Sequence, residues 1–105
     1  MSKNNIVAIV DVTCFSEREF GFDKIAMNIA RFPEVETVAV VSGKADLMVK
    51  LTTTSLEAVS KFVTEVLAPM LGVRSTATHF FMKTYKLNGS LLFDEPKPSR
   101  LPISA

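Results

Sequence analysis

The feature that most constrains this fold is a short glycine-containing connection between two stretches of β-forming residues. Residues 35–41 and 47–51 are rich in valine and leucine, and both are expected to be strands. The turn segment Ser42-Gly43-Lys44-Ala45 lies between them. A connection this short cannot carry the chain across a sheet, so the two strands are predicted to form an antiparallel hairpin.

A helical pattern is found on each side of this hairpin. Ser16–Glu19 fits a capping box, and Pro33 should end the helix that follows it. Thr54–Glu57 fits a second capping box, and Pro69 and Gly72 should close the second helix. The predicted apolar positions are Phe22, Ile25, Ala26, Ile29 and Phe32 in the first helix, and Leu56, Val59, Val63, Val66, Leu67 and Met70 in the second.

Two further strands complete the pattern, at residues 6–12 and 76–86. The order β-α-β-β-α-β predicts an α+β chain with a ferredoxin-like βαββαβ sandwich of the dimeric α/β-barrel type. Right-handed crossovers would place both helices on one face of the sheet. Residues 1–87 are expected to form one domain, and residues 88–105 a C-terminal extension.

The strands are apolar on both faces. Val10 and Val12 share one face of the first strand, while Val7 and Ile9 share the other. A sheet that is apolar on both faces needs cover on both, and the helices cover only one. A second copy of the chain is the simplest cover, so a homodimer or larger homo-oligomer is predicted.

The C-terminal extension has a different character. Asn88-Gly89 is a turn signal, and residues 91–93 could form a short additional strand. Pro96, Pro98 and Pro102 then break regular structure. Two interpretations stay open at this point, an arm that contacts a neighbouring subunit and a disordered end.

Charge and composition exclude several classes of function. Twelve basic against eleven acidic residues give a net charge of +1, which provides no electrostatic basis for binding nucleic acid. No apolar run approaches the roughly 20 residues needed to cross a bilayer, so no membrane segment is expected. The single cysteine, Cys14, cannot form an intrachain disulfide, and the cytoplasm is the expected compartment. No motif for a cofactor or a metal is present.

Few residues suggest chemistry. His79, the one histidine, could be a general base or a metal ligand, but packing in a subunit interface is the favoured interpretation. Cys14 is interpreted as a small buried hydrophobe and the phenylalanines as core and interface. The most informative segment is Gly43–Asp46, because glycine lets a ligand approach main-chain N–H groups and Asp46 could accept an ammonium group. The alternative role of Asp46 is to stabilise its own turn.

Residues 38–51, Val-Ala-Val-Val-Ser-Gly-Lys-Ala-Asp-Leu-Met-Val-Lys-Leu, resemble the V-x-x-x-x-G-x-x-D-x-x-x-x-V signature of the Lrp/AsnC effector-binding domain, also called the RAM domain. The resemblance extends over roughly residues 5–87 and includes Gly72-Val73 and the threonine-rich last strand. It implies sheet-to-sheet dimers that build octamers or decamers, with an amino acid or similar small effector bound between dimers. Carried onto this chain, the ligand-binding residues would be Gly43, Lys44, Ala45, Asp46, Thr76 and Thr78.

The family's helix-turn-helix is not found before the first strand, so the resemblance implies a stand-alone domain without direct DNA binding, which could co-assemble with full-length Lrp/AsnC regulators. Ala45 also stands where the family often has a larger residue. No catalytic residues and no cofactor are expected. The alternative is a small dimeric α/β-barrel enzyme, such as a monooxygenase-like or haem-using protein, in which His79 would be the residue to suspect.

Overall fold

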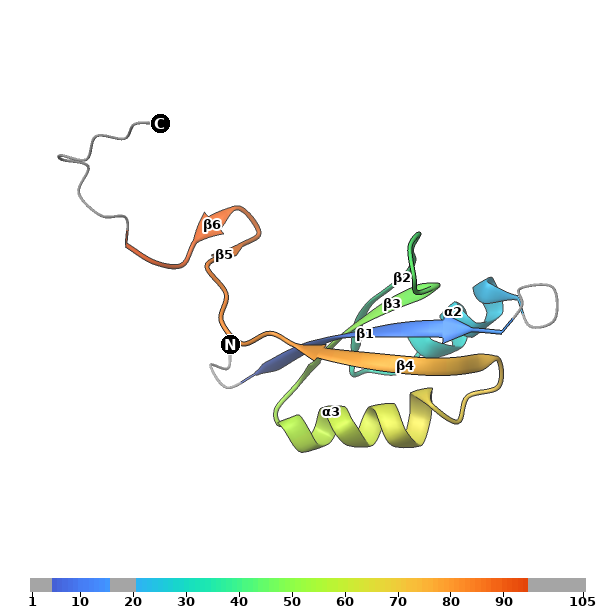
Figure 1. The fold of residues 1–105 in the computed structure, drawn as a ribbon. Coiled ribbons are helices and arrows are strands. Elements are labelled where there is room, and N and C mark those ends of the chain that lie inside the picture. Colours follow the sequence, from blue (N-terminus) through green and yellow to red (C-terminus); the bar gives the residue numbers. More distant parts are fainter. Residues whose placement is uncertain (1–4, 16–20, 95–105) are drawn as a thin grey trace.

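The computed structural model describes residues 5–15 and 21–94 (Figure 1). Its centre is a four-stranded antiparallel sheet in the order β2-β3-β1-β4. Both helices pack into a single core on one side of this sheet, which confirms the predicted ferredoxin-like βαββαβ fold. The strands are β1 (Ile6–Cys14), β2 (Val35–Val40), β3 (Leu47–Thr53) and β4 (Val73–Phe80).

Strand β1 is central and pairs on both sides. Val10 lies opposite Val49 of β3 and opposite Thr78 of β4. The β1–β4 register shifts between Thr13 and Cys14, where a bulge bends the end of β1. Strands β2 and β3 form the predicted antiparallel hairpin.

The helices begin at different residues from those predicted. Helix α2 (Phe22–Ala30) follows Gly21, which has φ of 73°, and the predicted Ser16–Glu19 cap lies outside the described residues. Helix α3 (Leu56–Phe62) has Ser55 as its N-cap, since the Ser55 hydroxyl accepts a hydrogen bond from the Ala58 amide at 3.0 Å. The prediction of a box starting at Thr54 was therefore wrong by one residue.

A π-helical segment, η1 (Val63–Leu67), continues α3. The Ala68 amide donates to the Val63 carbonyl at 2.8 Å, which is the wider π spacing. Pro69 lacks an amide hydrogen and would clash with the carbonyl four residues earlier in an α-helix, which gives a physical reason for the wider turn.

The core lies between the sheet and the helices. Val59 and Leu67 are buried as predicted, whereas Leu56, predicted on the same helical face, is 56% exposed because it lies in the first turn of α3. The Phe32 and Phe62 rings meet edge to face at 5.5 Å. The other buried apolar residues are Ala8, Val10, Val12, Cys14, Ile25, Ile29, Leu47, Val49, Leu51, Phe62 and Val73.

The opposite side of the sheet has no helix over it within the described residues. Its side chains are half-buried or exposed and include both apolar and charged groups. We call this surface the open face, and define it by Val7, Ile9, Asp11, Glu36, Met48, Lys50, Thr52, Ala77, His79 and Phe81.

The last strand differs most from its prediction. It spans Val73–Phe80 instead of residues 76–86, so it starts earlier and ends well before Lys86. The chain then leaves the sheet and forms a small separate hairpin of β5 (Lys86–Leu87) and β6 (Ser90–Leu91). The predicted turn at Asn88-Gly89 is present, with φ of 50° and 87°. The extra strand predicted at residues 91–93 is found at Ser90–Leu91, and Pro96, Pro98 and Pro102 lie outside the described residues.

Candidate ligand-binding loop

The loop between β2 and β3 lies at one end of the sheet, beside the end of β1. Gly43 has φ of 127°, a conformation that side-chain-bearing residues rarely adopt. No atom lies within 4 Å of the position a Cβ would take on Gly43, so the space above the backbone is open. Gly43 and Lys44 are exposed and Ala45 is half-buried, so main-chain groups of this loop are accessible to a ligand.

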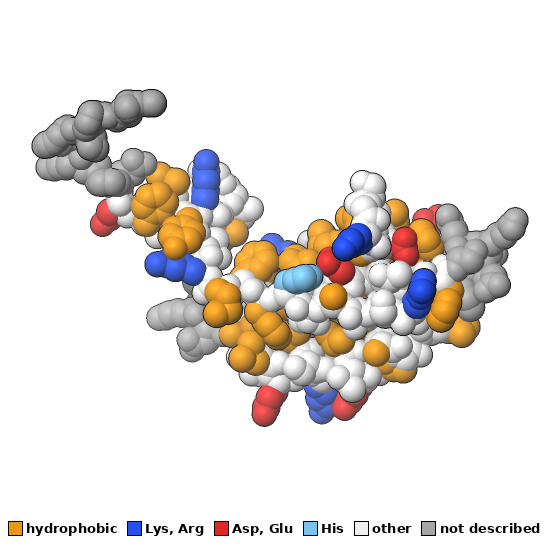
Figure 2. Space-filling view, viewed as in Figure 1, with side chains coloured by type: hydrophobic (Ala, Val, Ile, Leu, Met, Phe, Trp, Pro, Cys, Tyr) orange, Lys and Arg blue, Asp and Glu red, His pale blue; other side chains and the backbone are white. Residues whose placement is uncertain are grey.

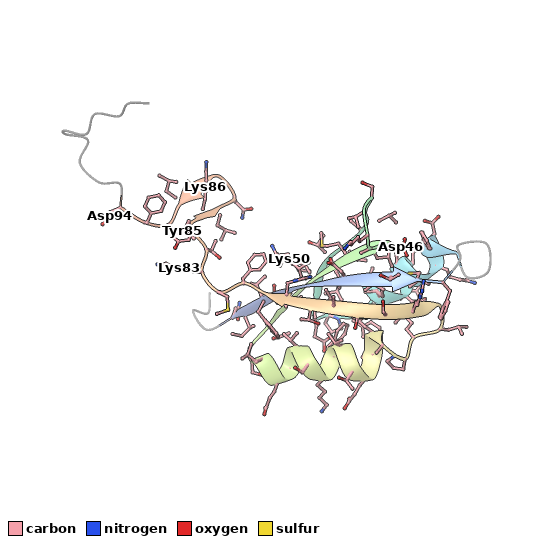
Figure 3. All side chains as sticks on the ribbon, in the orientation of Figure 1. Asp46, Lys50, Lys83, Tyr85, Lys86 and Asp94 are labelled. Atoms are coloured by element: carbon pink, nitrogen blue, oxygen red, sulfur yellow. The ribbon has the colours of Figure 1, made fainter. Side chains whose placement is uncertain are left out.

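Asp46 fixes the loop to the neighbouring strand (Figure 3). Its amide donates to the Val12 carbonyl at 3.0 Å, and its carbonyl accepts from the Val41 amide at 3.0 Å. Its carboxylate Oδ2 accepts from the Cys14 amide at 2.8 Å, two residues beyond Val12, where the pairing of β1 with β3 ends. Asp46 therefore has a structural role of its own, which accounts for one of its two carboxylate oxygens.

The two threonines lie on β4, on the other side of β1 from the loop. Thr76 lies opposite Val12 and Thr78 opposite Val10, so both face the helix side of the sheet, where they are half-buried. Two strand spacings amount to about 10 Å, so the loop and Thr76 flank the end of β1 without touching. The structure thus places four of the predicted residues together in the loop, and Thr76 and Thr78 apart from them.

Cys14 is buried beside the Asp46 carboxylate. Burial, and to a smaller extent the negative charge of Asp46, raise the pKa of the Cys14 thiol. The thiol is therefore held in its protonated form at neutral pH, and this environment disfavours a nucleophilic cysteine.

The open face carries a polar pair that the sequence patterns did not indicate. His79 Nε2 lies 3.1 Å from Asp11 Oδ2, although 68 residues separate the two in the chain. Beside them, Lys50 Nζ lies 3.9 Å from Glu36 Oε1 and 5.9 Å from the centre of the Phe81 ring. The only available signal was Asp11 itself, a carboxylate that interrupts the apolar run of the first strand.

The described residues contain no group of three or more His, Cys, Asp or Glu side chains that could hold a metal ion. Within the same residues, no helix is long and apolar enough to cross a bilayer. His79 and Asp11 form the only histidine-containing polar pair in the described part of the chain, and both side chains are accessible at the surface of the sheet.

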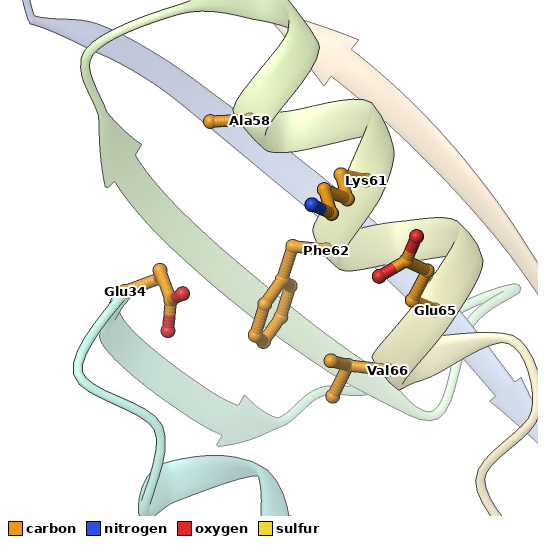
Figure 4. A pocket seen from close by; sticks show the side chains of 6 residues that line it. All are labelled: Glu34, Ala58, Lys61, Phe62, Glu65 and Val66. Atoms are coloured by element: carbon orange, nitrogen blue, oxygen red, sulfur yellow. The ribbon is translucent and has the colours of Figure 1, made fainter.

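A shallow pocket lies on the helix side, at the opposite end of β2 and β3 from the loop (Figure 4). Its volume is about 260 Å³, and Phe62 and Val66 provide apolar surface beneath the charged side chains at its rim. Its lining residues are Glu34, Ala58, Lys61, Phe62, Glu65 and Val66. Sequence patterns did not predict this pocket, because its lining residues come from two segments that are distant in the chain, the start of β2 and the helix formed by α3 and η1.

Comparison with known proteins identifies the family of this chain. The profile of the Lrp/AsnC ligand binding domain matches residues 7–91. The uncharacterized HTH-type transcriptional regulator YugG of Bacillus subtilis is 37% identical over 99 residues, which is 94% of this chain and 60% of YugG. The chain thus spans less than two thirds of that regulator.

Solved structures share the fold. TTHA0845 from Thermus thermophilus is 26% identical, with a TM-score of 0.70 over 78% of this chain and 99% of its own. The transcriptional regulator NMB0573 from Neisseria meningitidis, solved as an L-Met complex, is 24% identical, with a TM-score of 0.72 over 82% of this chain and 55% of its own. The chain belongs to the Lrp/AsnC family, and residues 7–91 are its ligand-binding domain.

Proposed function

We propose that this chain binds an amino acid or a similar small effector at the Gly43–Asp46 loop and couples that binding to assembly. The observation that carries the proposal is the exposed loop at Gly43, whose backbone has open space above it and whose end is tied to β1 by the bond from the Cys14 amide to Asp46. Main-chain N–H groups of such a loop can donate hydrogen bonds to a ligand carboxylate. The second oxygen of Asp46 would receive the ligand ammonium.

The separation of the loop from β4 bears on how the site is completed. The loop alone offers too few groups to surround a ligand, and Thr76 and Thr78 lie beyond β1, on the helix side of the sheet. We therefore propose that a neighbouring dimer closes the site, and that the threonines contribute from that second copy. A ligand that contacts two copies favours the state in which they are assembled.

Assembly is proposed to start at the open face. This face is half apolar and lacks a helix above it, and a second copy would cover it. A dimer formed in this way would then build into an octamer or decamer, alone or with full-length Lrp/AsnC regulators.

A regulatory role is favoured over catalysis, since the related proteins are named transcriptional regulators. In this proposal the chain acts in the cytoplasm. It does not contact DNA directly, because its net charge of only +1 provides little attraction to the phosphate backbone. The enzyme alternative would depend on His79 and Asp11, which the proposal places in a subunit interface.

The first experiment is a thermal-shift screen of the twenty amino acids, with L-Met included because NMB0573 was solved in complex with it. A ligand that binds only the folded state raises the melting temperature. We expect at least one amino acid to stabilise the protein, and native mass spectrometry should show whether it also changes the oligomer. If no amino acid changes either quantity, the proposal is wrong.

Asp46→Asn then tests the site. Asparagine keeps an oxygen that can accept the Cys14 amide, but it removes the charge that would bind the ammonium. We expect calorimetry to show roughly tenfold or greater loss of affinity, as for a hydrogen bond to a charged group worth about 1.5–3 kcal/mol. Glu34→Gln is the matched control, since it removes a carboxylate from the helix-side pocket instead. The opposite result, with affinity lost only in Glu34→Gln, would move the ligand to that pocket.

A further inference from the structure

The chain beyond β4 forms a hairpin that stands away from the rest of the molecule (Figure 1). Lys86 pairs with Leu91 and Leu87 with Ser90, while Asn88 and Gly89 make the turn. The Leu92 amide donates to the Tyr85 carbonyl at 2.9 Å, and the Tyr85 and Phe93 rings meet edge to face at 6.1 Å. We call residues 82–94 the hairpin arm.

The hairpin arm is apolar and uncovered. Met82 is 90% exposed, Tyr85 57% and Leu92 52%, and Leu87, Leu91 and Phe93 are also exposed. Figure 2 shows hydrophobic side chains along the arm, which projects from the body of the protein. An isolated two-stranded hairpin is marginally stable at best in water. Clustered apolar side chains of this kind mark a surface that binds another molecule.

We propose that the hairpin arm of one copy packs on a second copy of this chain along the edge of its open face, beside the area that the two sheets bury. The inference rests on the proposed open-face dimer and adds a second contact to it, in which each copy embraces the other. In a two-fold dimer both arms make the same contact, so neither arm keeps its apolar surface exposed.

The apolar surface is continuous between the open face and the arm. Phe81 lies where β4 meets the arm, its amide donates to the Val7 carbonyl at 3.0 Å, and its side chain is part of the open face. Val7, Ile9 and Met48 extend the same surface across β1 and β3. A dimer that buries the open face therefore brings its edge next to the base of both arms.

Charge also favours the open face as the surface that receives the arm. Lys83 and Lys86 give the arm two positive charges against one from Asp94 (Figure 3). The open face carries the carboxylates Asp11 and Glu36 against one lysine, Lys50, which already lies near Glu36. The arm is thus net positive and the open face net negative when His79 is neutral. Opposite charges of this kind guide association and fix its orientation.

Photo-crosslinking can test where the arm lies. Benzoylphenylalanine replaces Phe93 in the full chain, and isotopically heavy and light copies are mixed before irradiation. We expect crosslinks between heavy and light copies, at peptides that contain residues 7–11 or 48–52. Crosslinks confined to one copy, or directed to α2 or α3 of another, would overturn the proposal.

Sedimentation velocity provides an independent readout. The double variant Leu92→Ser, Phe93→Ser should raise the dimer dissociation constant about tenfold or more, because two apolar side chains lose their cover. Leu71→Ser is the matched control, since Leu71 is 79% exposed and lies outside both the arm and the open face. A double variant that associates like wild type refutes the arm contact and leaves the open-face dimer standing. A wild-type monomer would refute both.

Discussion

Asp46 joins the hairpin loop to the end of β1, which lies 32 residues earlier in the chain. Its carboxylate accepts from the Cys14 amide beyond Val12 and Leu47, the last pair between β1 and β3. The same side chain is thus positioned to stabilise the fold and, in the proposed function, to fix the loop for a ligand, and two substitutions can separate these roles.

Asp46→Ala should lower the free energy of unfolding by about 1–3 kcal/mol, because it leaves the Cys14 amide without its acceptor. Asp46→Asn should recover most of that loss, since its amide oxygen can accept the same bond. Urea denaturation of the ligand-free proteins measures both values. Equal stability of the alanine variant and wild type would show that the bond to Cys14 adds nothing to the fold.

Cys14 should make the protein sensitive to alkaline pH. Its folded-state pKa is raised, so the folded protein favours the protonated thiol more strongly than the unfolded chain does. This contribution is complete below the unfolded thiol value of about 8.5 and is lost as pH rises through the higher folded value. Melting temperature should therefore fall more steeply above about pH 8.5 in wild type than in Cys14→Ala. Parallel curves for the two proteins would contradict this.

At the scale of elements, the start of α3 depends on one hydroxyl. Ser55→Ala should cost about 1 kcal/mol, since the Ala58 amide loses its capping partner. Thr54→Ala is the matched control, because Thr54 is the neighbouring exposed hydroxyl residue and precedes the N-cap. Chemical denaturation of both variants should show the loss in Ser55→Ala alone. A larger loss of stability in Thr54→Ala than in Ser55→Ala would show that Thr54 is the N-cap.

At the scale of the whole molecule, the open face is proposed to hold copies together. Ile9→Lys places a charge between Lys50 and His79, the two residues opposite Ile9, and should convert the oligomer to monomers. Met27→Lys is the control, since Met27 is 55% exposed on α2. Light scattering should show small particles for Ile9→Lys and wild-type size for the control. If wild type has the mass of a single chain, 11.5 kDa, at micromolar concentration, the proposed assembly is wrong.

The sequence by itself determined the elements and their order. Alternating apolar residues, helical spacing and the short Gly43 connection depend on local sterics, so they predicted the βαββαβ fold and the position of the candidate loop. The one-residue error at Ser55 has a local cause too, because Thr54 and Ser55 are both suitable N-caps and only the backbone geometry selects between them.

Only the tertiary structure decided which distant groups meet. The bond from the Cys14 amide to Asp46 depends on the start of β3 lying beside the end of β1, and the Asp11–His79 pair depends on β4 lying beside β1. The tertiary structure also ended β4 at Phe80, which lies opposite Ala8, two residues from the start of β1 at Ile6. The residues beyond β4 leave the sheet and form the arm. Strand length is set by the neighbour as much as by the strand's own residues, and a single chain's sequence pattern does not contain the register of that neighbour.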